Sequence, residues 1–250
     1  MNKLANKIAV VTGASKGIGA AIARQFAAEG ATVVVNYATS REGADKVVAD
    51  IAAAGGKAVA IGADIGVEAD VRKLFQAVKE LHGRVDVLVN NAGIYTFEPL
   101  GEITPAGFRA IYGTNVLGTL LASREAVALM PAAGGAIVNI GSVASGMAPP
   151  SAAIYAGSKG AVDVITKSLA KELGPRGIRV NAISPGLTLT EGVHTAGIAN
   201  SDFERQMIAI TPLGRAAQPL DIALPAVFLA SDDARFVTGE TLYVGGGAGM

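Results

Sequence analysis

The chain has 250 residues, half of them hydrophobic, and its 21 basic and 21 acidic side chains cancel. This balance argues against a nucleic-acid-binding surface, which would carry excess Lys and Arg. There is no cysteine and there are only two histidines, so we expect neither thiolate chemistry nor a bound metal.

The N-terminus reaches a β-branched run and a glycine too early for a signal peptide. The uncharged stretch 126–158 is broken by Pro131 and Pro149, so it cannot form one membrane-spanning helix. We therefore predict a cytoplasmic protein with no membrane partner.

Short apolar runs alternate with helical patterns along the chain. Strands are predicted over 7–11, 32–36, 58–63, 85–89, 136–140, 179–183 and 241–244. Helices are predicted over 15–30, 41–54, 68–82, 105–130 (one long helix or two abutting ones), 153–173 and 220–230. This alternation predicts an α/β fold, with a doubly wound parallel sheet covered by helices on both faces.

No linker or change in composition divides the chain, so we predict one domain over residues 1–250. The stretch 186–202 is long, irregular and rich in Gly and Thr. Loops of this kind often cover a substrate, and we expect a lid over about 186–213. The alternative is a variable surface loop.

The candidate catalytic residues lie between Ser142 and Lys159. Tyr155 and Lys159 stand four residues apart, so on a helix their side chains share one face. An ammonium group favours a nearby phenolate, and we expect Lys159 to lower the pKa of Tyr155 towards the range of a general acid or base. Ser142 would hydrogen-bond the same substrate oxygen. The alternative is an ordinary aromatic side chain covered by a lysine.

A glycine-rich loop follows the first strand and opens the first helix. The helix N-terminus offers free N–H groups to a pyrophosphate, and glycines let it approach closely. The loop consists of Gly13, Ala14, Ser15, Lys16, Gly17, Ile18 and Gly19. Gly13, Ser15 and Gly17 also match the nucleophile elbow of α/β-hydrolases, but neither His82 nor His194 is well placed to complete a triad.

The end of the second strand indicates which dinucleotide binds. Sites for the unphosphorylated ribose carry an acidic residue there, whereas this chain has Asn36 followed by Tyr37. Lys16, Ser40 and Arg41 could bind a 2′-phosphate. We therefore predict that NADP(H) is preferred and that NAD(H) remains possible.

Two further positions with asparagine allow either a functional or a purely structural interpretation. The segment from Asn90 to Gly93 follows the fourth strand and suits a ribose and nicotinamide, or it is simply a polar turn. Asn115 interrupts a helical stretch, either as a kink or water site or as a solvent-facing side chain.

Taken together, TGASKGIG, NNAG, Asn115, Ser142, Tyr155 with Lys159, and Pro185-Gly186 followed by Thr190 resemble the short-chain dehydrogenase/reductase family over the whole chain. The resemblance implies a single Rossmann-like domain, assembled as a homotetramer. It makes Tyr155 the proton donor, Ser142 the group that orients the substrate oxygen, and Lys159 the ribose ligand, while Asn115 holds a relay water.

By the same resemblance Asp64 and Ile65 contact the adenine and Thr190 the carboxamide. The complete predicted cofactor site is Gly13, Ser15, Lys16, Gly17, Ile18, Gly19, Asn36, Tyr37, Ser40, Arg41, Asp64, Ile65, Asn90, Ala92, Gly93, Tyr155, Lys159, Pro185, Gly186, Thr188 and Thr190. The predicted substrate site is Ile94, Tyr95, Ser142, Val143, Met147, Tyr155, Leu187 and His194.

The chain departs from the family pattern at two places. The segment Val244-Gly245-Gly246-Gly247 lacks the aspartate that many relatives carry before the double glycine, which concerns packing or assembly. Gly141 stands where a second serine is common, and we expect extra space beside the substrate there.

These observations predict an NADPH-dependent carbonyl reductase that also works in the alcohol-oxidising direction. The mostly apolar substrate residues favour a small ketone or aldehyde with apolar groups. The alternatives are a 3-oxoacyl-[acyl-carrier-protein] reductase, a sugar or polyol dehydrogenase, and a non-catalytic nucleotide sensor.

Overall fold

The computed structural model describes residues 2–195, 197 and 200–249, without the side chain of His194. One parallel sheet runs through the molecule in the order β3-β2-β1-β4-β5-β6-β7. Its strands are β1 (Ile8–Val11), β2 (Thr32–Tyr37), β3 (Lys57–Gly62), β4 (Val87–Asn90), β5 (Gly135–Ile140), β6 (Ile178–Pro185) and β7 (Thr241–Val244). The predicted α/β class and parallel sheet are confirmed.

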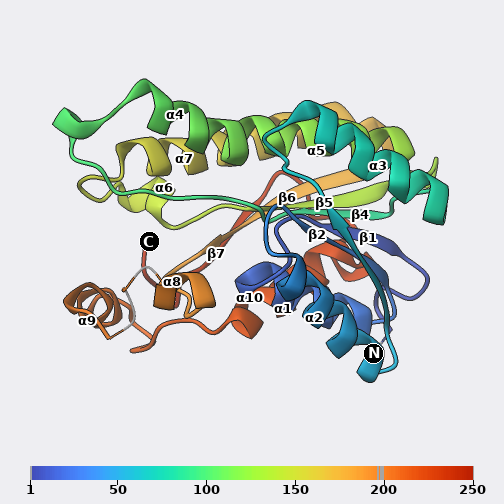
Figure 1. Cartoon of the computed structure of the whole chain (residues 1–250), viewed down its shortest axis with the longest axis horizontal. Coiled ribbons are helices and arrows are strands. Elements are labelled where there is room, and N and C mark those ends of the chain that lie inside the picture. Colours follow the sequence, from blue (N-terminus) through green and yellow to red (C-terminus); the bar gives the residue numbers. More distant parts are fainter. Residues whose placement is uncertain (1, 196, 198–199, 250) are drawn as a thin grey trace.

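Helices cover both faces of the sheet (Figure 1). One layer contains α1 (Gly17–Ala28), α2 (Arg41–Ala53) and α10 (Pro219–Ala230). The other layer contains α3 (Glu68–His82), α4 (Pro105–Tyr112), α5 (Gly118–Leu129) and α7 (Ala153–Leu173). Short helices follow the carboxyl ends of β5 and β6, namely α6 (Ala144–Met147), α8 (Glu191–Thr195) and α9 (Asp202–Ala209).

The strands are apolar on both sides because each side faces a helical layer. In β1, Ala9 and Val11 join the core under α1, α2 and α10, whereas Val10 joins the core under α3, α5 and α7. All three side chains are fully buried. Strand order reverses between β1 and β4, where open α/β sheets form their ligand crevice at the carboxyl ends of the strands.

The segment predicted to be irregular is partly helical, so that description of 186–202 is wrong. It contains α8, and α9 begins at its end. The side chain of Ser201 accepts a hydrogen bond from the backbone N–H of Glu204, which caps the start of α9. The sequence Ser-Asp-Phe-Glu at 201–204 carried that capping signal.

The stretch 105–130 forms two abutting helices, one of the two predicted outcomes. A π-helical turn over Gly113–Leu117 joins α4 to α5. Within the part of the chain that the structure describes, no helix is both long and apolar enough to cross a membrane.

Candidate active site

A cavity of about 270 Å³ opens at the carboxyl ends of β4, β5 and β6. Its wall contains seven of the eight predicted substrate residues: Ile94, Tyr95, Ser142, Val143, Met147, Tyr155 and Leu187. The eighth is His194, whose side chain lies outside the described part of the structure. Lys159, Gly93, Pro185, Gly186, Thr188, Thr190 and Ile18 from the predicted cofactor set line the same cavity.

Tyr155 and Lys159 lie one turn apart on α7, as predicted. The Lys159 ammonium is 5.9 Å from the centre of the Tyr155 ring and donates a 2.8 Å hydrogen bond to the carbonyl oxygen of Ile140 at the end of β5. Lys159 is only 6% exposed. Burial lowers its pKa to about 8, and the Asp163 carboxylate opposes that change.

The prediction that the pKa of Tyr155 is lowered is wrong for the cofactor-free protein. Burial raises this pKa above its ordinary value, the hydrogen bond with Ser142 lowers it, and the neighbouring Tyr95 raises it. The Lys159 ammonium is directed to the Ile140 carbonyl, so it does not offset the burial. A phenol with a raised pKa stays protonated at neutral pH, so Tyr155 holds a proton there, but it releases that proton less readily than a group whose pKa lies near 7.

Ser142 lies in the turn between β5 and α6. Its Oγ accepts a 3.1 Å hydrogen bond from the backbone N–H of Ala144, and its hydroxyl also makes the hydrogen bond with Tyr155. The Ser145 hydroxyl donates a 2.9 Å hydrogen bond to the Ser142 carbonyl oxygen and fixes the turn.

Gly141 does not create the extra space expected beside the substrate. A Cβ at this position would lie 2.6 Å from the Ser184 Oγ and 3.4 Å from a carboxylate oxygen of Asp163. The side chain missing at Gly141 therefore makes room for Ser184 beneath the turn, and that expectation is wrong.

Asn115 lies in the π-helical turn and is buried, which excludes the solvent-facing alternative. Its side chain accepts a 2.9 Å hydrogen bond from the Ile94 N–H and donates 2.9 Å and 3.0 Å bonds to the Ile94 carbonyl and the Ser158 Oγ. A Cβ on Gly93 would lie 3.3 Å from the Asn115 Oδ1 and 3.4 Å from the Lys159 Nζ. Asn115 thus holds the segment after β4 against the catalytic helix.

Asn91 supports the glycine loop, although we did not include it in the predicted site. Its Nδ2 donates to the carbonyl oxygens of Thr12 and Gly13, at 2.9 Å and 3.0 Å. A Cβ on Gly19 would lie 2.4 Å from that Nδ2, and one on Gly13 would lie 2.7 Å from the Cα of Ala92. Gly13 and Gly19 are therefore required by packing within the loop.

The N-terminus of α1 already binds an anionic group. The Gly17 N–H donates a 2.9 Å hydrogen bond to a carboxylate oxygen of Glu191, the first residue of α8. A carboxylate oxygen resembles a phosphate oxygen as an acceptor, and both are stabilised at a helix N-terminus. This part of the predicted pyrophosphate site fits its ligand, and Glu191 occupies it.

Asn36 is not free to contact a ribose. Its Nδ2 donates to the carbonyl oxygens of Ile61 and Ala63, and its Oδ1 accepts from the Gly13 N–H. This corrects its assignment as a cofactor side chain. Tyr37 is the last residue of β2, and its ring packs over Gly62, where a Cβ would lie 3.1 Å from the Tyr37 Cζ.

The other residues predicted for a 2′-phosphate lie close to one another. Ser40 precedes α2 without capping it through its side chain, so that helix N-terminus keeps free N–H groups. A Cβ on Gly43 would lie 2.7 Å from the Ser40 Oγ and 2.8 Å from the Ser15 carbonyl oxygen, which places α2 against the glycine loop. Lys16 is exposed on this loop, and Arg41 pairs with Asp45 at 3.5 Å.

Two other residues of the predicted cofactor site use their side chains for contacts within the fold. Ile65 is 3% exposed, and its side chain packs in the core under α3 and α5. The Asn90 Nδ2 donates to Ser123 and to Asn139, within a buried polar network between β4 and β5. Asp64 is exposed, and its carboxylate accepts from the Gly66 N–H at 2.9 Å.

An aromatic cluster surrounds the catalytic tyrosine. The ring of Tyr155 lies edge-on to Tyr95 at 6.0 Å and to Phe97 at 6.1 Å between centroids. Phe203 of α9 lies 6.4 Å from Phe97. Phe97 and Phe203 were not predicted, because they are distant in the sequence and meet only when α9 folds over the cavity.

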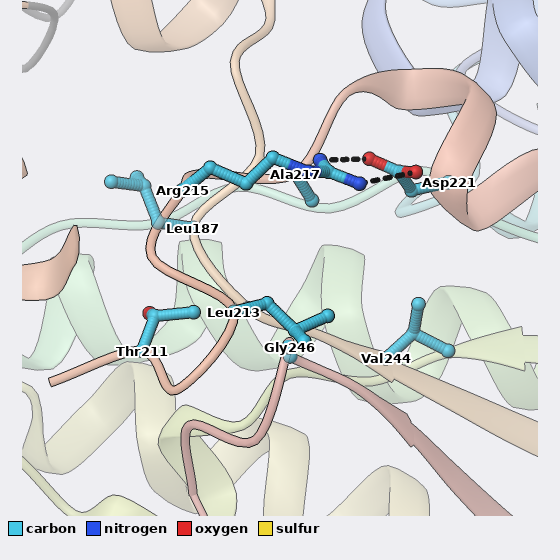
Figure 2. A pocket seen from close by; sticks show the side chains of 10 residues that line it. Leu187, Thr211, Leu213, Arg215, Ala217, Asp221, Val244 and Gly246 are labelled. Carbon is cyan, nitrogen blue, oxygen red and sulfur yellow. Dashed lines mark hydrogen bonds and ion pairs between the residues drawn. The ribbon is translucent and has the colours of Figure 1, made fainter.

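The segment that carries α8 and α9, residues 189–216, leaves the sheet and returns at one place. Thr188 and Ala217 form an isolated parallel bridge, and the Ala217 N–H donates to the Leu187 carbonyl at 2.8 Å. Beside this bridge, the Arg215 guanidinium binds both carboxylate oxygens of Asp221, at 2.6 Å and 3.0 Å (Figure 2). We call residues 189–216 the lid, after the substrate-covering loop that the sequence predicts over about 186–213, and its covering role stays a prediction.

The C-terminal glycines pack against the base of the lid. Leu213 and Gly246 lie side by side in Figure 2, and the Leu213 N–H donates to the Gly246 carbonyl at 3.0 Å. Gly247 has a φ of +93°, and a Cβ there would lie 2.6 Å from the Cγ of Pro212. This part of the chain therefore serves packing.

Known proteins resemble the chain over nearly its whole length. A family model described as enoyl-(acyl carrier protein) reductase matches residues 13–249. The short chain dehydrogenase/reductase AacuN of Aspergillus aculeatus is 40% identical over 255 residues, which cover 98% of this chain and 96% of that protein. The chain belongs to the short-chain dehydrogenase/reductase family.

Two further members extend the comparison. An uncharacterized oxidoreductase of Methylorubrum extorquens is 54% identical over 247 residues, covering 99% of each chain. The crystal structure of the angucycline C-6 ketoreductase LanV, with bound NADP, has a TM-score of 0.93 and 36% identity, and the match covers 99% of this chain and 97% of that one.

Membership of the short-chain dehydrogenase/reductase family decides between the classes left open by the sequence. The fold is Rossmann-like, and the protein is an oxidoreductase that acts on hydroxyl and keto groups. The hydrolase and the non-catalytic sensor are therefore excluded.

Replacing Glu191 by Gln should strengthen cofactor binding, because it removes the negative charge from the N-terminus of α1. We expect the Kd for NADPH to fall about two- to fivefold in a fluorescence titration. The control Asp202→Asn removes a lid carboxylate that pairs with Arg205 instead. Weaker NADPH binding in Glu191→Gln would show that Glu191 supports the cofactor rather than competing with it.

Proposed function

We propose that this protein is an NADPH-dependent reductase of ketones or aldehydes that also oxidises the corresponding alcohols. The observation that carries the proposal is the placement of Ser142, Tyr155 and Lys159 in one cavity, next to the anion-binding N-terminus of α1. A carbonyl group in this cavity would meet two hydroxyl donors.

Lys159 and Thr190 would hold a nicotinamide in this cavity, and when bound it would supply the hydride that the carbonyl carbon accepts in reduction. Tyr155 donates its hydroxyl proton to the carbonyl oxygen, which completes the alcohol and leaves a phenolate. The Ser142 hydroxyl stabilises charge on the oxygen by a second hydrogen bond. Oxidation of an alcohol reverses these steps, with the Tyr155 phenolate as the proton acceptor.

Lys159 is proposed to bind the nicotinamide ribose and to stabilise the phenolate. Its ammonium is 5.9 Å from the Tyr155 ring and remains largely charged at neutral pH, since its pKa is about 8. Asn115 acts by holding Ile94 and Ser158 in place around this pair. Its proposed relay water would lie between Asn115 and Lys159.

The preference for NADPH rests on charge at the edge of the glycine loop. Lys16 and Arg41 supply positive charge, and the free N–H groups of α2 add to it. The described part of this edge, from Tyr37 to Arg41, contains no carboxylate that would repel a 2′-phosphate. The solved structure of LanV also holds NADP.

The cavity favours a ketone attached to flat apolar groups. Tyr95, Phe97 and Phe203 offer ring faces and edges within reach of Tyr155, and such surfaces pack well against aromatic ligands. LanV is itself an angucycline ketoreductase. A 3-oxoacyl-[acyl-carrier-protein] reductase remains the second candidate, because the matching family model is described by an acyl-carrier-protein substrate.

We also propose a homotetramer, which requires two different faces for self-association. One exposed apolar face consists of Phe108, Leu117 and Leu120 on the α4–α5 side. The other is an exposed stripe on α10, formed by Leu220, Leu224 and Phe228. Light scattering should give four times the chain mass, and Phe228→Arg should reduce it to a dimer.

Tyr155→Phe tests the mechanism. The loss of the hydroxyl should lower kcat by at least about a hundredfold, while the Kd for NADPH changes by less than about twofold. Tyr243→Phe is the matched control, since it removes a tyrosine hydroxyl from an exposed side chain of β7 that is not among the cavity residues. Normal turnover in Tyr155→Phe would refute Tyr155 as the proton donor.

A substrate panel tests the proposed class. We expect kcat/KM for 1-tetralone to exceed that for a 3-oxoacyl thioester by about tenfold or more, because the cavity is lined by aromatic rings. A preference for the thioester would support the second candidate. Efficient oxidation of glucose with no ketone reduction would instead indicate a sugar dehydrogenase.

Replacing both Lys16 and Arg41 by Ala tests the cofactor assignment. The Kd for NADPH should rise about 10- to 100-fold, because two charged contacts to the 2′-phosphate are lost, and the Kd for NADH should stay within about twofold. The Lys171→Ala/Arg235→Ala variant removes the same charge outside the cavity. Equal losses for both dinucleotides would contradict the assignment.

A further inference from the structure

Asp163 lies behind the catalytic residues and is not one of the residues predicted for the site. It follows Lys159 by four residues on α7, so the two side chains share one face of the helix. It is partly buried, and burial raises the pKa of its carboxyl group above the ordinary value. A carboxylate that is costly to bury needs compensating partners.

Those partners come from several elements. On α7 the charged groups facing Asp163 are Lys159 and Lys167. From the other elements it meets hydroxyl groups, namely Ser145 of α6 by a hydrogen bond and Thr241 of β7, whose Oγ1 lies 3.5 Å from the Asp163 Oδ1. The absence of a side chain at Gly141 leaves room for the carboxylate under β5.

Lys159 and Asp163 approach adjacent residues at the end of β5: the Lys159 Nζ lies 2.8 Å from the Ile140 carbonyl oxygen, and a Cβ on Gly141 would lie 3.4 Å from an Asp163 carboxylate oxygen. At such a position the charge of Asp163 acts on Lys159. Among the described residues, Asp163 is the group whose charge opposes the effect of burial on the Lys159 ammonium. The other titratable neighbour of Lys159 is Tyr155, one turn earlier, which is neutral when protonated. Without the Asp163 carboxylate, the buried ammonium would lose its proton more easily.

A second connection runs from Asp163 to Ser142. The Ser145 hydroxyl has one proton and two acceptors within reach, the Asp163 carboxylate and the Ser142 carbonyl oxygen at 2.9 Å, so it lies between them and shares its hydrogen bond. The short helix α6 therefore has a fixed point on α7, and the turn with the catalytic hydroxyl lies directly before it.

We propose that Asp163 is a positioning residue for the reaction, because its carboxylate keeps Lys159 in the ammonium form and holds the Ser142 turn through Ser145. The role in the reaction rests on the proposed reductase function. The effect on Lys159 is a property of the cofactor-free protein and can be measured without any substrate.

The first test is an NMR titration of the cofactor-free protein, labelled with ¹³C at the lysine Cε and assigned with Lys159→Met. We expect the Lys159 midpoint at about pH 8 in the original protein. In Asp163→Asn, which keeps the size of the side chain, the midpoint should fall by on the order of one pH unit. An unchanged or higher midpoint would overturn the proposal.

Matched variants separate charge from packing. Ser145→Ala breaks the connection to Ser142 and Thr241→Val removes the other hydroxyl, but both retain the carboxylate, so neither should move the Lys159 midpoint. Asp163→Glu, which retains the charge with a longer side chain, should keep the midpoint near that of the original protein. If Thr241→Val lowered the midpoint as much as Asp163→Asn, the effect would be one of packing and the proposal would fail.

Kinetics then test the role in the reaction. The alkaline limb of kcat/KM for ketone reduction should move to lower pH in Asp163→Asn and stay in place in Ser145→Ala, whose kcat should fall about three- to tenfold at all pH values. Identical pH profiles in the two variants would refute the proposal. A lowered NMR midpoint in a protein without reductase activity would instead refute the proposed function and leave the charge effect standing.

Discussion

The burial of one ammonium group constrains most of the active site. Lys159 is 6% exposed, and a pKa of about 8 against 10.5 in water means that its burial costs about 3 kcal/mol at neutral pH. This cost is fully present below about pH 8 and disappears as the pH rises towards 10.5, because the uncharged amine has no charge to remove from water. The surrounding core must provide that free energy.

The neighbours of Lys159 follow from that constraint. The end of β5 offers the Ile140 carbonyl as an acceptor, and Gly93 lacks a side chain where the ammonium passes. Asn115 must face inward at the same level, which the π-helical turn between α4 and α5 allows by shifting its side chain relative to a regular helix. The π-helical turn is therefore part of the arrangement that surrounds the buried ammonium.

Much of this architecture was predictable from short-range patterns. The bounds of α3 and α7 agree with the prediction because both helices have clear apolar periodicity. The direction of a side chain was harder to predict: Asn36 turns into the sheet because the Gly13 backbone and β3 surround it. The sign of the Tyr155 pKa change was missed because it depends on burial and on the Ile140 carbonyl, which competes for Lys159. Neither can be read from a four-residue spacing.

The two ends of the lid meet at one narrow base. The chain leaves the fold at Thr188 and rejoins it at Ala217, and the described residues between them form an excursion whose ends are joined. Such an excursion can change in length and composition without altering the register of any strand. A lineage built on this scaffold can therefore exchange residues 189–216 as a cassette, acquiring new substrates while the buried lysine and its supports stay as they are.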